Sequence, residues 1–303
     1  MNDLIVALLR SNIAASVVIL AVLALRPAVR RWFGAETAYW LWAAPPMAAL
    51  AILIPGRLAE EGVTVAPGLD VGQGTGLALL AIWLVGFFIA VVFLWLEQAA
   101  FLRASKAGRA GPAVVGVICP RIVMPRDDRL YSSEERAVVR AHEWEHIERC
   151  DPRAQAVMAV FQCLFWFNPL AHLAVYLAKL DQELACDAAV VRRRPNIRAL
   201  YARTLLKTQL AATRLPFGCY WPARGRHPLE TRVALLRSAC RAYGALGPVL
   251  VAAGVLAVGA AAWMAQPPIP QPFSAAPAES TPAILVYLSR GETISRSTDR
   301  SAP

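Results

Sequence analysis

Long uncharged apolar runs separate the charged stretches of the chain and predict a membrane protein. Residues 77–96 form an uncharged run of 20 residues and residues 243–265 one of 23, and each can cross a hydrocarbon core of about 30 Å as a helix. Residues 4–25 and 38–54 are two further candidates, although the second is shorter and interrupted by Pro45-Pro46. We therefore expect four transmembrane helices.

The composition and the start of the chain support this interpretation. The 303 residues are 57% hydrophobic with a mean hydropathy of +0.45, which is too apolar for a soluble domain of this size. The first apolar run has no basic region before it, and the nearest basic cluster, Arg26 to Arg31, follows it. We therefore expect an uncleaved first span and not a signal peptide.

The basic residues predict the orientation in the membrane. Of the 31 Lys and Arg, 26 lie either between the first two apolar runs or between residues 97 and 243. Because positively charged loops stay in the cytoplasm, these segments are predicted to face inward, while residues 56–76 and the tail 266–303 face outward. The net charge of +10 then suits an anionic inner leaflet, and no direct binding of nucleic acid is expected.

The organisation follows from these spans. Residues 1–97 carry three transmembrane helices, residues 98–242 form a cytoplasmic domain, and residues 243–265 form the fourth span. The Pro/Ser/Thr-rich residues 266–303 should form an extended tail outside. The six cysteines include no C-x-x-C pair, so we expect free thiols and no disulfides.

Local patterns predict the first elements of the cytoplasmic segment. Two β-branched runs at residues 113–119 and 121–124 indicate a small hairpin or edge sheet. Ser132 followed three residues later by Glu135 has the pattern of a capping box, in which both side chains satisfy free N–H groups. A helix over residues 133–149 should follow.

Residues 142–146 read His-Glu-Trp-Glu-His, an H-E-x-x-H motif within that helix. A spacing of four places both imidazoles on one helix face, where they can bind one zinc ion. Glu143 lies beside the first ligand, where its carboxylate can act as general base on the metal-bound water. The alternative is a helix surface bearing two histidines by chance, but the chain has only four histidines and two form this pair.

A catalytic zinc site usually takes three protein ligands and leaves one position for water. The segment Asp181-Gln-Glu-Leu-Ala-Cys-Asp187 offers a candidate, because Glu183 and Asp187 are four residues apart on one helix face. Glu183 could bind the metal while Asp187 accepts a hydrogen bond from a ligand histidine and fixes its tautomer. Without the upstream histidines, both carboxylates would be interpreted as a solvated face.

The apolar stretch at residues 156–180 could be taken for a fifth span, but it contains Gln162, Asn168-Pro169 and His172. A crossing here would also place Glu183 on the other side of the membrane from His142. We therefore expect two helices broken at Asn168-Pro169 that pack on the core or dip into the membrane interface.

Four separated motifs resemble, in order, the BlaR1/MecR1-type antirepressor peptidases, which are the M56 family of integral-membrane zinc metallopeptidases. They are Pro120-Arg-Ile-Val-Met-Pro125, Ala141-His-Glu-Trp-Glu-His-Ile-Glu-Arg-Cys-Asp151, Phe165-Trp-Phe-Asn-Pro-Leu170 and Gln182-Glu-Leu-Ala-Cys-Asp187. The resemblance implies four spans, an outside amino terminus and a cytoplasmic protease segment between spans three and four. It also implies that Glu183 is the third zinc ligand and Asp187 its supporting partner.

The chain departs from the best-known members of that family after the last span. In those proteins an extracellular penicillin-binding sensor follows, and its acylation switches on proteolysis that removes a transcriptional repressor. Here 38 residues follow Ala265, without an S-x-x-K motif, so we do not expect this segment to sense β-lactams.

These observations predict a mainly α, polytopic protein of the inner membrane, with a zincin-like helical domain and a small β edge sheet on the cytoplasmic side. The expected function is zinc-dependent endoproteolysis in signalling, with Zn²⁺ as cofactor. The expected substrate is a cytoplasmic protein, such as a transcriptional repressor, or the chain itself, and it would add as an extended strand to the sheet. Membrane lipids are the expected neighbours, and the outside tail is a candidate site for an envelope partner.

Two alternatives stay open. The first is a housekeeping membrane protease resembling the HtpX/Ste24 group, which shares the H-E-x-x-H and E-x-x-x-D arrangement and would differ in substrate breadth. The second is a signal transducer that has a structural zinc site and no catalytic activity. The intact Glu143 argues against the second, since a structural site needs no base.

Three further features receive weaker interpretations. His227 is a candidate for oxyanion stabilisation or substrate contact. His172 is expected to be a satisfied interface histidine and not a metal ligand. Arg192 to Arg194 are expected to form a solvated turn near lipid headgroups, with a processing site as the alternative.

Overall fold

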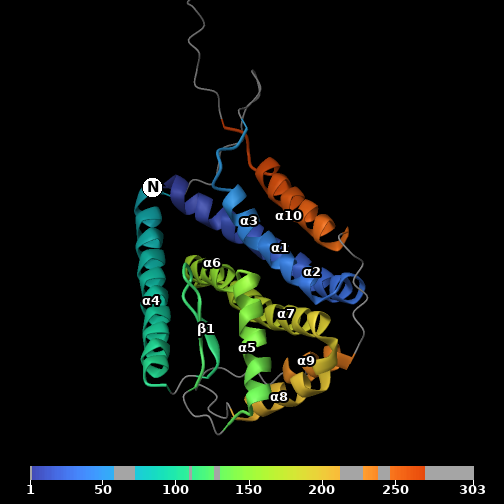
Figure 1. Cartoon of the computed structure of the whole chain (residues 1–303). Coiled ribbons are helices and arrows are strands. Elements are labelled where there is room, and N and C mark those ends of the chain that lie inside the picture. Colours follow the sequence, from blue (N-terminus) through green and yellow to red (C-terminus); the bar gives the residue numbers. More distant parts are fainter. Residues whose placement is uncertain are drawn as a thin grey trace, which may run out of the picture.

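The computed structural model describes residues 2–57, 72–108, 111–125, 130–211, 228–237 and 246–269. Helices dominate these residues (Figure 1). The apolar helical segments are α1 (Asn2–Phe33), α2 (Ala35–Trp40), η1 (Leu41–Ala43), α3 (Ala44–Ala51), α4 (Gln73–Lys106) and α10 (Leu246–Met264). The other elements are β1 (Ala113–Val115), β2 (Arg121–Val123), α5 (Ser133–Glu148), α6 (Asp151–Leu164), α7 (Pro169–Arg193), η2 (Pro195–Ile197), α8 (Arg198–Ala211) and α9 (Pro228–Arg237).

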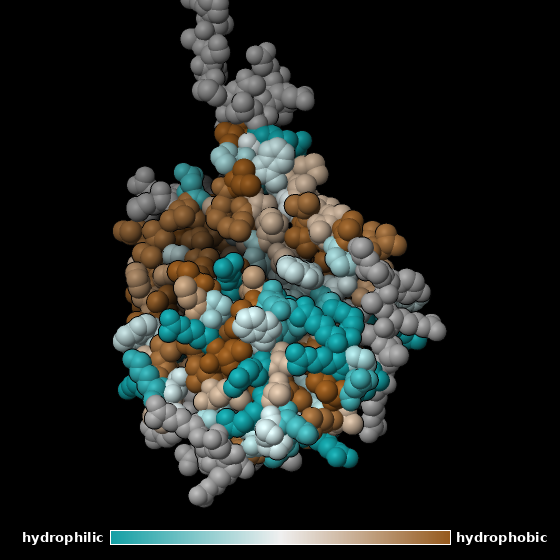
Figure 2. All heavy atoms as spheres, viewed as in Figure 1, coloured by the Kyte–Doolittle hydropathy of each residue, from teal (hydrophilic) through white to brown (hydrophobic). Residues whose placement is uncertain are grey.

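Within the described residues, α1, α4 and α10 are each long and apolar enough to cross a membrane. Hydrophobic side chains gather in the upper half of the molecule, over these helices, and hydrophilic ones in the lower half (Figure 2). The chain is thus a membrane protein, as its composition predicts. The prediction of exactly four spans is not confirmed.

The predicted second span is divided into short pieces. Gly34, with φ of 94°, lets the chain reverse after α1, because a side chain would strain this backbone conformation. The segment then continues as α2, η1 and α3, with prolines at the start of α3, where a missing N–H costs least. These pieces run back alongside α1 (Figure 1).

The predicted break at Asn168-Pro169 is confirmed. α6 ends at Leu164, and Asn168 caps α7 by accepting a hydrogen bond from the N–H of Leu170 at 2.9 Å. The Asn168 amide also donates to Asn12 and Ser16 of α1, at 2.7 and 2.9 Å. The turn between α6 and α7 therefore packs against the apolar helix α1, while the expected dip into the membrane interface stays a prediction.

α4 is attached to the same turn by close packing. The indole N–H of Trp83 donates to the Leu164 carbonyl at 3.0 Å, and that of Trp166 donates to the Trp83 carbonyl at 3.2 Å. At Gly86 an added Cβ would lie only 2.1 Å from the Trp166 ring. Gly86 lies near the middle of the apolar run 77–96, so the α6–α7 turn packs against the middle of this run.

This contact gives a first prediction, for the variant Gly86→Ala. The added methyl group should displace Trp166 and lower the free energy of unfolding by about 1–3 kcal/mol, as overpacked sites do. Thermal unfolding of the detergent-solubilised protein should show a lower midpoint. The matched control is Gly254→Ala in α10, where a Cβ meets nothing within 4 Å. Equal midpoints for the two variants would contradict the close approach of α4 to Trp166.

The larger hydrophobic core joins the membrane helices to the site helices. It contains Ile19 of α1 and Trp42 of η1 together with Phe161 of α6 and Leu184 of α7. A smaller core brings together residues of α5, α7, α8 and α9. The larger core therefore draws its residues from both of the predicted segments, 1–97 and 98–242.

Polar contacts also tie α7 to the membrane helices. Asp181 of α7, 1% exposed, accepts hydrogen bonds from Trp42 at 2.8 Å, from Arg26 at 3.2 Å and from Arg30 at 3.4 Å. The next residue, Gln182, donates to the hydroxyl of Tyr39 in α2 at 3.1 Å. These hydrogen bonds fix the position of α7 along and around its axis, directly before the predicted metal ligand Glu183.

The predicted small sheet and first helix are confirmed. β1 and β2 pair antiparallel, with Val114 opposite Ile122. α5 begins after Ser132, whose hydroxyl accepts from the N–H of Glu135 at 3.2 Å while its own N–H donates to the Glu135 carboxylate at 2.9 Å. The capping box thus exists as expected.

Candidate metal centre

α5 carries the H-E-x-x-H motif on its inner face. His142 and His146 are one turn apart with their ring centroids 4.8 Å from each other. After α5, Cys150 adopts the left-handed conformation, with φ of 57°, which few residues other than glycine adopt. This sharp reversal begins α6 at once and returns Asp151 to the end of α5.

Each histidine is held through its Nδ1 atom. The hydroxyl of Tyr201 donates to Asp187 at 2.5 Å, so its oxygen accepts the Nδ1–H of His142, at 2.8 Å. Asp187 itself is 3.5 Å from that nitrogen. The Nδ1–H of His146 donates to Asp151 at 2.7 Å. Both rings are thereby assigned the tautomer that leaves Nε2 with a free lone pair.

The two Nε2 atoms and one carboxylate converge. The Nε2 atoms of His142 and His146 are 3.2 Å apart. The oxygens of Glu183 lie 3.4 Å from Nε2 of His142 and 3.6 Å from Nε2 of His146. Ligand atoms at about 2.0–2.2 Å from a tetrahedral zinc are about 3.3–3.6 Å from one another. Two lone pairs and a carboxylate this close repel one another unless protons or a metal cation lie between them, so these residues fit a metal ion.

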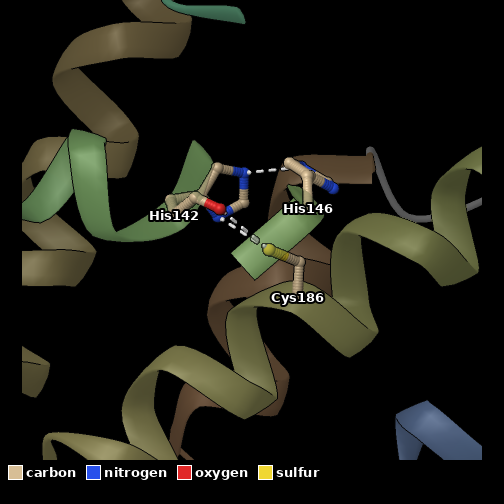
Figure 3. Close-up of side chains that lie close together, drawn as sticks. All are labelled: His142, His146 and Cys186. Atoms are coloured by element: carbon tan, nitrogen blue, oxygen red, sulfur yellow. Dashed lines mark hydrogen bonds between the residues drawn. The ribbon is translucent and has the colours of Figure 1, made fainter. Parts of the chain in front are cut away.

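A second donor set includes a thiol. One ligand atom each of His142, His146 and Cys186 lies within 4.8 Å of the others. The sulfur of Cys186 lies 3.5 Å from Nδ1 of His142 and donates to the His142 carbonyl at 3.3 Å, on the side of the ring away from the contact with His146 (Figure 3). Nδ1 is already bonded to Tyr201. Glu183 is therefore the better third ligand, since it faces the Nε2 atoms.

Arg232 of α9 connects the carboxylates of this site. It is 7% exposed and binds Asp187 through two hydrogen bonds of 2.7 Å each. It also lies 3.1 Å from the nearer oxygen of Glu183. The guanidinium thus balances the two acidic side chains and orients Glu183 toward the histidines.

The environment shifts the pKa values of the site. Burial raises the pKa of Glu143, and nearby Glu183 adds to this effect. His142 and His146 oppose it. Burial disfavours the charged form of His146, but its hydrogen bonds to Asp151 and Cys186 raise its pKa to about 10. Burial alone would raise the pKa of Glu183. The contacts with His142 and Arg232 outweigh burial and hold this pKa well below its usual range. A metal ion entering this site must displace protons, so metal affinity should rise with pH.

The site opens into a large cavity of about 1010 Å³. Its wall includes His142, Glu143, His146 and Glu183, so the predicted base and ligands face one space. Further wall residues come from α4, β1, α6 and α8. The cavity is large enough for several residues of a polypeptide.

The structure thus brings together His142, His146, Glu143, Glu183 and Asp187. His227 lies outside the described residues. The two ring nitrogens of His172 form hydrogen bonds of 2.8 Å each, one to the Gln162 side-chain amide and one to the Trp166 carbonyl. His172 is not part of the metal centre. In the basic run, Arg192 pairs with Glu36 of α2 at 2.6 Å and Arg193 with Glu145 of α5 at 3.1 Å.

Sequence analysis missed three residues of the site: Asp151, Tyr201 and Arg232. Asp151 stands five residues after His146 and ends the second of the four motifs that resemble the M56 family, so this motif was the available signal. Tyr201 and Arg232 come from α8 and α9, which no motif linked to the histidines.

Comparison with known proteins agrees with this site. The profile of the BlaR1 peptidase M56 family matches residues 6–67 and 67–236, which is most of the chain and includes every residue of the metal centre. The chain belongs to the M56 peptidase family. M56 peptidases are metalloproteases, and the converging donors of α5 and α7 fit that class.

Individual M56 relatives match over shorter stretches. Regulatory protein BlaR1 of Bacillus licheniformis is 35% identical over 81 residues, which cover 27% of this chain and 14% of that protein. The methicillin resistance mecR1 protein of Staphylococcus aureus is 28% identical over 103 residues, which cover 33% of this chain and 17% of that protein. The match thus spans about a sixth of these curated relatives. No solved structure matches the chain.

Proposed function

We propose that this M56 peptidase is a zinc-dependent endopeptidase. The observation that carries the proposal is the convergence of Nε2 of His142, Nε2 of His146 and the carboxylate of Glu183 within 3.2–3.6 Å of one another. Three nitrogen and oxygen donors beside an open cavity are typical of catalytic zinc, whereas structural sites are closed by a fourth protein ligand.

The residues of the site have distinct roles in peptide hydrolysis. A zinc ion held by the three ligands would polarise the scissile carbonyl and lower the pKa of the attacking water. Glu143 takes a proton from that water as its oxygen bonds to the carbonyl carbon, and gives the proton to the amine nitrogen as the C–N bond breaks. Its raised pKa suits both transfers. Asp151, Tyr201 and Asp187 hold the two imidazoles in the required tautomer.

We further propose that the site faces the cytoplasm and acts in signalling. The excess of Lys and Arg on this side of the spans supports the orientation. The relatives are a regulatory protein and a methicillin resistance protein, which supports a regulatory role. The substrate would be a cytoplasmic protein, such as a transcriptional repressor, or the chain itself.

Metal removal tests the proposal. The purified protein should contain about one zinc ion per chain, and dialysis against 1,10-phenanthroline should remove the metal together with cleavage of added peptide. One equivalent of zinc should restore cleavage, and excess zinc at about 100 times its Kd should raise the unfolding free energy of the metal-free protein by about 2.7 kcal/mol. Cleavage that survives complete metal loss would refute the mechanism.

A further inference from the structure

The cavity of the metal centre extends to a membrane helix. Beside the site residues, its wall includes five residues of α4, namely Leu94, Trp95, Glu97, Gln98 and Phe101. The same wall also includes residues 112–117, which contain β1. Figure 1 shows α4 running along the side of the molecule next to β1.

These α4 residues belong to the inner end of the span. α4 has 34 residues and is therefore about 51 Å long, against a hydrocarbon core of about 30 Å. Leu94 and Trp95 fall at the end of the uncharged run 77–96, and Phe101 follows within two turns. The cavity therefore reaches the level of the inner membrane surface.

The α4 wall combines the apolar Leu94, Trp95 and Phe101 with the polar Glu97 and Gln98, and it has few protein neighbours. Trp95 is 66% exposed. In the described residues, only 6% of the most apolar 18-residue window of α4 is buried. Above the cavity, α4 is attached at Trp83 and Gly86 to the α6–α7 turn. A chain segment that leaves the inner leaflet can thus meet Trp95 and Phe101 before it reaches the metal ligands.

We propose that the substrate segment is apolar, lies at the inner surface of the membrane and enters the site laterally between α4 and β1. Within the described residues β1 pairs only with β2, so its second edge can bond to the backbone of an extended segment. The apolar side chains of that segment pack on Leu94, Trp95 and Phe101, which determine specificity. This inference rests on the proposed peptidase function.

Of the substrates proposed above, this route favours the chain itself or another membrane-bound protein over a soluble repressor that reaches the cavity from the cytoplasm. A soluble substrate would have to carry its apolar segment through water before that segment met Leu94, Trp95 and Phe101. A segment held at the membrane is delivered to that wall and loses less freedom on binding. The continuity between the metal centre and the span therefore favours the membrane-associated segment.

The test uses the full chain in liposomes of phosphatidylethanolamine and phosphatidylglycerol at 3:1. The probes are quenched fluorescent peptides with a Leu-Phe-Leu-Phe core, each anchored by a 20-residue Leu/Ala helix. The first probe joins this core to its anchor by a two-residue linker. The second has a 30-residue Gly/Ser linker, which lets the core move about 30 Å away from the membrane anchor. A third has a Ser-Thr-Ser-Thr core on the short linker.

The short-linker apolar probe should be cleaved with a kcat/KM about tenfold or more above that of each other probe. Phe101→Ala should lower this value about tenfold, whereas Phe93→Ala should not change it. Phe93 is 59% exposed on the same helix and is not part of the cavity wall. Equal cleavage of the long-linker probe, or equal effects of the two variants, would overturn the lateral route.

Photocrosslinking separates this inference from the proposed function. In the Glu143→Gln background, p-benzoylphenylalanine at position 101 should crosslink the short-linker probe, and at position 93 it should not. Crosslinking at 101 without any cleavage by the wild type would keep the lateral route and refute the peptidase. Cleavage by the wild type without crosslinking at 101 would keep the peptidase and refute the route.

Discussion

Glu143→Gln should abolish peptide cleavage while the protein keeps about one zinc ion per chain. The amide has almost the shape of the carboxylate but cannot take a proton from water, and loss of a general base typically costs about 10²–10⁴ in rate. His142, His146 and Glu183 are untouched, so the zinc content should not change. Cleavage of a quenched peptide and zinc content, measured on the same preparation, check both parts.

Glu145→Gln is the matched control, because it lies on the same helix and is also buried, at 4% exposed. Glu145 points away from the metal centre and pairs with Arg193 at 3.1 Å, so its variant should keep cleavage within about twofold. Comparable loss in the two variants would show that a damaged α5, and not a missing base, explains the result. Full activity of Glu143→Gln would exclude Glu143 as the base.

Arg232→Met should produce the second large effect, this time on stability and metal binding. It removes the cationic partner of the buried Asp187 and leaves this carboxylate beside that of Glu183. Breaking a buried ion pair typically costs about 3–5 kcal/mol. We expect a matching fall in the free energy of unfolding and weaker zinc binding, measured by denaturant titration and by competition with a zinc indicator.

Two further variants test this explanation. Arg198→Met, at an exposed position of α8, should change stability by less than about 0.5 kcal/mol. In the double variant Arg232→Met with Asp187→Leu, removal of both charges should recover much of the stability, while zinc binding stays weak because Tyr201 has lost its acceptor. A double variant no more stable than the single one would show that Arg232 acts by packing alone.

The parts of the site that the sequence predicted depend on local spacing. The four-residue interval between His142 and His146 defines one helix face wherever the helix lies, and so does the interval between Glu183 and Asp187. Ser132 and Glu135 likewise determine the start of α5 by contacts within one turn. Asn168-Pro169 interrupts the helix whatever surrounds it.

The remaining features depend on contacts between distant segments. Tyr201 and Arg232 reach the centre because α8 and α9 pack beside α5 and α7, and no periodicity in the sequence reports that arrangement. Asp151 returns to His146 only because Cys150 takes a conformation unusual for its residue type. The division of residues 35–51 into three helical pieces also follows from packing, since Pro45 and Pro46 indicate a break but not its partners.

Asp181 and Glu183 are separated by one residue on α7, about 200° apart around the helix. Arg26, Arg30 and Trp42 hold the first of them from the membrane side, while the second faces the histidines. A shift of α1 against α7 would therefore misplace a metal ligand directly. Harsh extraction from lipid should accordingly inactivate the protein by loss of zinc before its helices unfold, and mild detergents with retained lipid should preserve both metal and activity.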